Sequence, residues 1–149
     1  MKHQSKYDSH FEPYESEVVD ALLAMPMLQG RNVKREVSHE FGRTDVVVYD
    51  DKDKILIEVK TKWNSHENTV AVGQLMMGRA AFERQRPAHK HVMLAIACPD
   101  RPTVRLALIL KSLQIEVIEV LMPEREKRIA QGGRVAIDAL AAAYRGDAS

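Results

Sequence analysis

The feature that most constrains the fold is a β-rich stretch in the first half of the chain. Residues Asn32–Glu40 alternate loosely between apolar and polar, while Arg43–Tyr49 and Lys54–Lys60 are rich in β-branched and aliphatic side chains. Such side chains pack well on a pleated surface, and the short polar turns between the segments are typical of neighbouring antiparallel strands. We therefore predict three strands in an antiparallel meander.

Helical and buried-strand patterns lie on either side of this meander. The predicted elements outside it are a helix at Tyr14–Met25, a helix at Thr69–Glu83, a strand at His91–Cys98, a helix at Val104–Lys111 and a strand at Ile115–Val120. This order predicts an α/β (α+β) domain with a central mixed sheet and helices on both of its faces.

The length of 149 residues fits one folded domain. We expect a flexible tail at 1–12, the domain at 13–121, and C-terminal helices at 122–149 that pack on the domain or on a second copy of the chain. No apolar run reaches 18 residues, so we expect no membrane span, and the single cysteine, Cys98, excludes an internal disulfide and favours a reducing, cytoplasmic location. The net charge of +1 does not by itself indicate a nucleic-acid partner.

Two charged residues interrupt the apolar third strand. Glu58 and Lys60 are two residues apart, so they share the face of the strand that also carries Leu56. Burying unpaired charge costs free energy, so charges among apolar neighbours are usually paired, at an edge, or bound to an ion.

Strand register brings a second carboxylate to the same place. If Asp50–Asp53 form a four-residue turn, Tyr49 pairs with Lys54 and Asp45 lies opposite Glu58. Two carboxylates across a ladder repel each other, and a divalent cation between them would relieve that repulsion. Mg²⁺ is suited to such a site because it is held by one or two carboxylates together with substrate phosphates.

Asp45, a hairpin and then Glu58-Val59-Lys60 resemble the motif of the PD-(D/E)XK nuclease superfamily, which includes restriction endonucleases and Holliday-junction resolvases. The predicted α-β-β-β-α-β order is also that of the superfamily's restriction-endonuclease-like core. Thr44 stands where the motif has proline, a departure shared by many members.

The resemblance implies a role for each matching position. Asp45, Glu58 and Glu15 would bind Mg²⁺, for which Mn²⁺ could substitute; Lys60 would be the catalytic lysine; and Gln74 would brace the site or contact the substrate. We prefer Glu15 to Glu17 because it shares a predicted buried helix face with Val18, Val19 and Leu22.

The resemblance further implies hydrolysis of DNA phosphodiester bonds, with endonuclease action as the first expectation. Arg43, Lys62 and Arg79 would contact the DNA. A homodimer is left open, because cutting two strands requires two sites. The alternative is a non-catalytic module that uses a nuclease-like fold to bind nucleic acid or protein.

Each candidate residue also has a purely structural explanation. Asp45 would pair with Arg35 or Arg43; Glu58 and Lys60 would form a surface ion pair; Glu15 would favour a helix start; Gln74 would be a buried amide; and Trp63 would cover the core instead of stacking on a base.

Overall fold

The computed structural model describes residues 13–51, 53–85 and 91–122. The chain divides into two compact units, and the fold described below is that of the unit Tyr14–Leu121. The predicted tail at 1–12 and all but Met122 of the predicted helical segment 122–149 lie outside the described residues. The division into tail, domain and C-terminal helices therefore stays a prediction.

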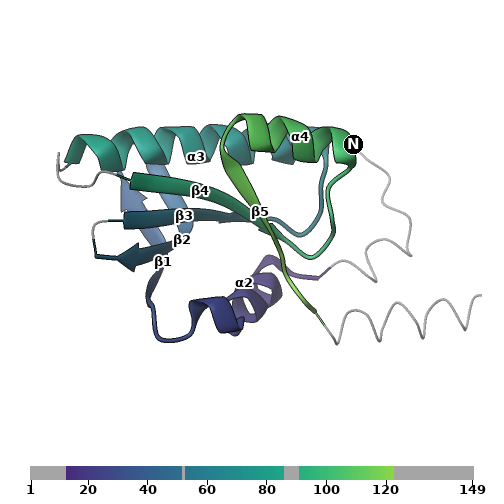
Figure 1. Ribbon diagram of the computed structural model, residues 1–149, viewed down its shortest axis with the longest axis horizontal. Coiled ribbons are helices and arrows are strands. Elements are labelled where there is room, and N and C mark those ends of the chain that lie inside the picture. The colour runs from purple at the N-terminus through teal and green to yellow at the C-terminus, as the bar shows by residue number, and fades with distance from the viewer. Residues whose placement is uncertain (1–12, 52, 86–90, 123–149) are drawn as a thin grey trace, which may run out of the picture. The chain divides into compact units, whose positions relative to one another are not determined.

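Five strands form one mixed sheet in the order β1-β2-β3-β4-β5 (Figure 1). The strands are β1 (Asn32–His39), β2 (Gly42–Asp50), β3 (Asp53–Val59), β4 (His91–Cys98) and β5 (Ile115–Glu119). The pairs β1–β2 and β2–β3 are antiparallel, whereas β3–β4 and β4–β5 are parallel. The predicted meander and the predicted mixed sheet are both confirmed.

The turn between β2 and β3 fixes the register of the two strands that carry the candidate carboxylates. Tyr49 pairs with Lys54, as predicted, and the ladder continues to the pair Val46–Ile57. Asp45 and Glu58 are the next position beyond that pair. The tight polar turn thus sets which residues meet at the far end of the hairpin.

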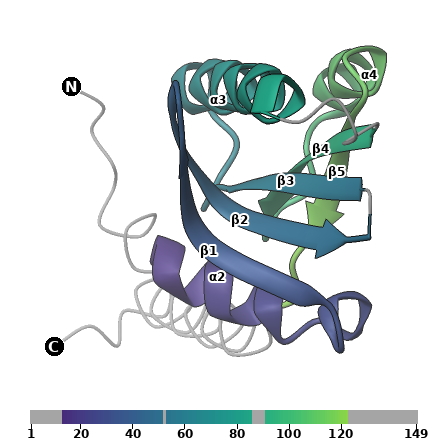
Figure 2. The same ribbon diagram turned by 90° about the vertical axis from the view of Figure 1, so that its left-hand side faces the viewer.

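Helices cover both faces of the sheet (Figures 1 and 2). Helices α3 (Ser65–Gln85) and α4 (Val104–Ser112) lie on one face, and α2 (Glu15–Leu23) lies on the other, followed by a short 3₁₀ turn at Pro26–Leu28 that the sequence did not predict. None of the helices in these described ranges combines the length and the apolarity needed to cross a membrane.

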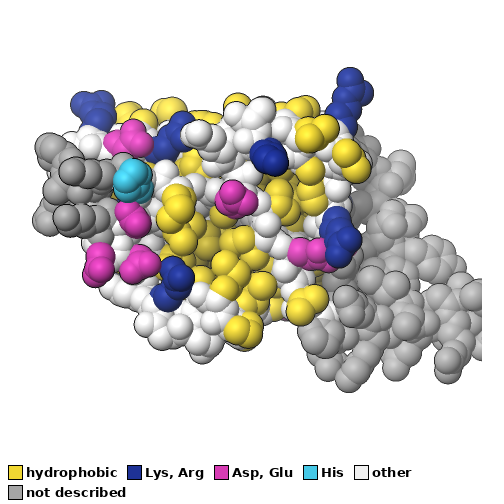
Figure 3. Space-filling model, in the orientation of Figure 1, with side chains coloured by type: hydrophobic (Ala, Val, Ile, Leu, Met, Phe, Trp, Pro, Cys, Tyr) yellow, Lys and Arg dark blue, Asp and Glu magenta, His cyan; other side chains and the backbone are white. Residues whose placement is uncertain are grey.

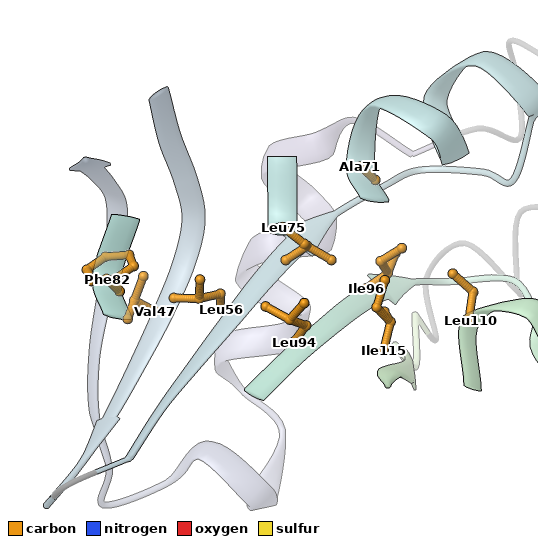
Figure 4. Close-up of a cluster of buried hydrophobic side chains, with 9 residues drawn as sticks. All are labelled: Val47, Leu56, Ala71, Leu75, Phe82, Leu94, Ile96, Leu110 and Ile115. Atoms are coloured by element: carbon orange, nitrogen blue, oxygen red, sulfur yellow. The ribbon is translucent and has the colours of Figure 1, made fainter. Parts of the chain in front are cut away.

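The main core lies between the sheet and the pair of helices α3 and α4. Figure 4 shows its side chains meeting there: Val47, Leu56, Ala71, Leu75, Phe82, Leu94, Ile96, Leu110 and Ile115. Alternate residues of each strand supply this layer, as a half-buried pleated surface requires.

Helix α3 begins four residues before its predicted start at Thr69. The side-chain oxygen of Asn64 accepts a hydrogen bond of 2.9 Å from the backbone N–H of Glu67. This contact satisfies one of the free N–H groups of the first turn, so the polar segment predicted as a connection becomes helical instead.

Helix α3 approaches the sheet most closely at Gly78. A Cβ atom at Gly78 would lie 3.2 Å from Leu56 Cδ1, 3.3 Å from Thr44 Oγ1 and 3.4 Å from His39 Nε2. These contacts are tighter than almost all real Cβ contacts, so a side chain here would force its neighbours to move by a few tenths of an ångström, and close packing favours glycine at this position.

Candidate active site

Asp45 and Glu58 come together where β2 and β3 separate. The Asp45 carboxylate reaches across the end of the ladder, and its Oδ2 accepts a hydrogen bond of 2.8 Å from the backbone N–H of Val59. The Glu58 side chain is only 2% exposed. The two carboxyl groups interact directly, because both the charge and the hydrogen bonding of Asp45 act on the pKa of Glu58.

Glu58 is held in a state that disfavours its charge. Its Oε1 atom is buried and has no hydrogen-bond partner. Burial above all, and then the neighbouring Asp45, raise the pKa of Glu58 to about 9. A carboxyl group in this state stays protonated at neutral pH unless a cation compensates the negative charge.

Lys60 provides a positive charge beside this pair. It follows β3 directly, and its backbone N–H donates a 2.9 Å hydrogen bond to the carbonyl of Ala97 on β4. Its ammonium group opposes the rise in the pKa of Glu58 and of Glu15, so it lies within electrostatic reach of both carboxyl groups.

Glu15 enters the same cluster from the first turn of α2. Partial burial is the largest cause that raises its pKa, followed by the charge of Asp45, while Lys60 acts in the opposite direction. The expectation that Glu15 is buried with Val18, Val19 and Leu22 is wrong, since the residue stays exposed to solvent and its carboxyl group is only partly covered. Glu17 has another role: its Oε1 accepts a 3.1 Å hydrogen bond from the backbone N–H of Tyr14.

Two further carboxylates that the sequence analysis did not select act on Glu15. Glu67, in the first turn of α3, and Glu36, on β1, both raise the pKa of Glu15. The pattern Asn64-x-x-Glu67 is a recognisable helix start and could have indicated Glu67. Glu36 has a positive φ of 50° inside a strand, a local feature that no sequence pattern announces.

The donor set suits a hard divalent cation bound through few protein ligands. Among the described residues, no three His, Cys, Asp or Glu side chains converge closely enough to hold a metal ion on their own. The pair of Asp45 and Glu58, with an unpartnered buried oxygen, matches the way Mg²⁺ is held by one or two carboxylates, with water and phosphate completing its shell. The residues present therefore fit Mg²⁺ or Mn²⁺.

Gln74 and Arg43 line a groove of about 270 Å³ between α3 and the turn that joins β1 to β2, and neither is among the groups that shift the pKa of Glu58 or Glu15. Arg79 lies elsewhere, where it lines a separate hollow with Glu83 and His91 and donates to the sulfur of Met76 at 3.2 Å. Lys62, just after β3, is partly buried.

The basic residues predicted to contact DNA are thus spread over the domain. The face in Figure 3 has an apolar area at its centre, and its Lys and Arg side chains are scattered and not gathered into one patch. Another hollow, of about 410 Å³, is lined mainly by apolar residues such as Met27, Ile55 and Met93. Its ionisable lining residues are Glu116 and Glu119.

Several structural explanations can now be judged. Arg35 lies 3.5 Å from Asp20, and Arg43 lies 3.9 Å from Glu36, so the ion pairs that the structure gives these arginines do not involve Asp45. Trp63 packs against the core, and its indole N–H donates a 2.7 Å hydrogen bond to the carbonyl of Asp100. Trp63 therefore has the structural role that the sequence left open.

Comparison with known proteins supports the fold. No family model matches this chain, and no curated protein sequence matches it. A crystal structure of a repair endonuclease from Pyrococcus abyssi superposes with a TM-score of 0.57 and 19% identity, over 75% of this chain and 49% of the endonuclease. A protein of unknown function matches with a TM-score of 0.45 and 18% identity over 70% of this chain and 56% of its own.

The chain thus spans about half the length of the repair endonuclease that it resembles. At this level of identity the similarity shows the fold alone. The domain has a nuclease-like, restriction-endonuclease-like fold, with a five-stranded mixed sheet flanked by helices.

Proposed function

We propose that this protein is a Mg²⁺-dependent nuclease of the PD-(D/E)XK type that hydrolyses DNA phosphodiester bonds, and that it acts as an endonuclease. The observation that carries the proposal is the buried Glu58 carboxyl group, which has an unpartnered oxygen and a raised pKa and lies beside Asp45. Perturbed carboxyl groups of this kind cluster at functional sites.

Asp45 and Glu58 are the proposed metal ligands, and Glu15 contributes from α2. When bound, the cation would supply charge stabilisation at the scissile phosphate and lower the pKa of the attacking water. The ammonium of Lys60 stabilises the negative charge that develops on the attacked phosphate. The hydrogen bond from Val59 N–H holds the Asp45 carboxylate in place, so this ligand is oriented before substrate arrives.

Arg43 and Lys62 would contact the DNA backbone near the carboxyl groups, and Arg79 would do so at a distance. Such contacts fix the position of a nucleic acid without reading its sequence. One catalytic centre per chain cuts one strand, so we further propose that cleavage of both strands of a duplex requires two copies.

The direct test is incubation with closed circular, linear, branched and single-stranded DNA, each with Mg²⁺, with Mn²⁺ and with a chelator. We expect cleavage with either metal, including cleavage of closed circles, and none with the chelator. Asp45→Asn removes a proposed ligand, and Asp50→Asn makes the same chemical change at an exposed position on the same strand.

Loss of cleavage in Asp45→Asn but not in Asp50→Asn supports the proposed centre, provided that both variants show the circular dichroism of the parent. Equal activity in the two variants would overturn it. Absence of cleavage on every substrate, together with DNA binding that ignores Mg²⁺, would favour a non-catalytic binding module.

A further inference from the structure

The groove between α3 and the β1–β2 turn has a composition that the fold does not explain. We call it the hairpin groove, and its lining includes Phe41, Arg43, Val70, Gly73, Gln74 and Met77. Its volume of about 270 Å³ lies at the lower end of small-molecule sites, so it suits a single ring system. Figure 2 shows the ends of β1 and β2 beside α3, the elements that supply the lining residues.

Large apolar side chains stand open around the groove. Phe41 is 41% exposed and Met77 is 48% exposed, and both line the groove. The exposed residues Gln74 and Arg43 line the same groove and supply an amide and a guanidinium group. An aromatic face, an amide and a guanidinium are the groups that stack on a nucleobase, bond to its edge and bind its phosphate.

The glycine at position 73 indicates that the groove has a role beyond packing. A Cβ atom at Gly73 would meet nothing within 4 Å, whereas one at Gly78 would contact Leu56, Thr44 and His39. Packing therefore explains Gly78 and does not explain Gly73. Glycine inside a helix costs roughly 1 kcal/mol relative to alanine, so the fold alone would favour a side chain at position 73.

The hairpin groove lies beside the proposed catalytic centre. Arg43 precedes Asp45 by two residues on β2, which is about 7 Å along a strand. A nucleotide bound in the groove would thus neighbour the phosphate at Asp45 and Glu58. The ion pair of Arg43 with Glu36 is long, at 3.9 Å, and both side chains are well exposed, so it leaves Arg43 able to turn to a phosphate.

We propose that the hairpin groove binds one unpaired nucleotide of the DNA, with its base against Phe41 and its phosphate at Arg43. This inference rests on the proposed function and narrows the substrate class. A base inside a duplex has its faces stacked and its edge paired, so it cannot enter the groove. The preferred substrate is therefore DNA with at least one unpaired nucleotide next to the cleaved bond.

The test measures binding by fluorescence anisotropy in chelator, so it does not depend on catalysis. The probes are one labelled oligonucleotide as a single strand, the same strand fully paired, the single strand with abasic positions, and free deoxyadenosine monophosphate as competitor. We expect the single strand to bind at least tenfold more tightly than the duplex or the abasic strand. Competition by the free mononucleotide at micromolar concentration would instead indicate a site for free nucleotides and overturn the assignment to DNA.

Gly73→Leu adds an apolar side chain to the lining of the groove, at a position where a Cβ atom meets nothing within 4 Å, and Ala80→Leu adds the same side chain to an exposed position of α3 outside the groove. We expect Gly73→Leu to lower the affinity for the single strand about tenfold, to leave duplex binding unchanged and to keep the melting temperature at or above that of the parent. Ala80→Leu should alter neither affinity.

Phe41→Ala provides a second, independent variant, and loss of one stacked base should weaken single-strand binding about tenfold. Affinities of Gly73→Leu and Phe41→Ala within twofold of the parent would overturn the proposal. If the groove behaves as expected but no metal supports cleavage, the proposed function fails alone. If closed duplex circles are cut and the parent shows no preference for unpaired DNA, only the groove proposal fails.

Discussion

Strand β3 carries two buried charged residues whose charges lie in opposite environments, one compensated and one not. Lys54 and Glu58 are four residues apart and share a face, and they are 8% and 2% exposed. The ammonium of Lys54 lies 4.5 Å from the ring centroid of Phe82 and 5.4 Å from that of Tyr49. Glu58 has an oxygen without a partner and lies beside a second acid.

The two residues differ in what compensates the cost of burying their charge. Aromatic rings compensate part of the cost of burying Lys54, so its position is explained by the folded chain itself. Burial and the charge of Asp45 make the charged form of Glu58 unfavourable, and its Oε1 atom has no hydrogen-bond partner, so we propose that a bound cation compensates this charge. Burial and charge alone would not have distinguished Glu58 from Lys54 as a candidate site residue.

The largest expected effect is on DNA cleavage, where substitutions of Glu58 and Lys54 should have different consequences. Glu58→Gln keeps the size of the side chain and removes its charge, so we expect at least a 1,000-fold loss of DNA cleavage with Mg²⁺, about 4 kcal/mol in the barrier. Lys54→Gln also removes a buried charge, at the other end of the strand. At a temperature where this variant is folded, its cleavage rate should stay within about threefold of the parent rate. Single-turnover cleavage measures both. Comparable losses in the two variants would remove the distinction between them.

The next effect concerns the cation beside the acids. Lys60→Met keeps the aliphatic stem and removes the ammonium, and we expect kcat to fall about 100-fold to 1,000-fold with little change in KM, because the charge acts mainly on the transition state. Lys34→Met, on the exposed strand β1, is the matched control and should behave as the parent. A rise in KM with unchanged kcat would instead assign Lys60 to substrate binding.

Substitution of Lys54, at the other end of the strand, should change the free energy of unfolding. Lys54→Ala removes a buried stem and its contact with Phe82, so we expect the free energy of unfolding to fall by about 2–3 kcal/mol. Lys54→Met keeps most of the packing and should lose less. Urea denaturation monitored by the circular dichroism of the helices gives both values. Unchanged stability in Lys54→Ala would show that the aromatic contact contributes nothing.

How far the sequence reaches can be judged on this same strand. The alternation of β3 and the tight turn before it were enough to predict the meander, the pairing of Tyr49 with Lys54, and the approach of Asp45 to Glu58. The sequence did not reveal that Lys54 is buried, because its partner Phe82 lies on α3 and the contact depends on how that helix crosses the sheet. The part played by Glu36 was hidden for a related reason, since a left-handed backbone residue inside a strand has no sequence signature.

The early start of α3 was missed because the prediction of this helix relied on hydrophobic periodicity. The segment before Thr69 is polar, and hydrophobic periodicity carries no information where the residues face water. Only the capping pattern of Asn64 and Glu67 marks the helix there, and it brings Glu67 towards the acidic cluster. Local hydrogen-bond chemistry, and not periodicity, was the informative signal at this edge of the site.

The smallest expected effect sharpens the comparison through pH. The pKa of Glu58 is raised from the ordinary value of 4.5 to about 9 in the folded protein. Between these two pH values the folded state binds more protons than the unfolded state, so the free energy of unfolding of the metal-free protein should fall as pH rises from about 4.5 to about 9. Glu58→Gln should lose this dependence and exceed the parent by about 1–2 kcal/mol at pH 8 in chelator.

Mg²⁺ provides the decisive contrast for this last prediction. A cation bound by the Glu58 carboxylate stabilises its charged form, so Mg²⁺ should raise the melting temperature of the parent at pH 8 and have little effect on Glu58→Gln. Lys54→Met should keep the full Mg²⁺ response despite its lower stability, because its partners are aromatic rings at the far end of the strand. A Mg²⁺ response that Glu58→Gln retains and Lys54→Met loses would reverse the roles assigned to the two buried charges.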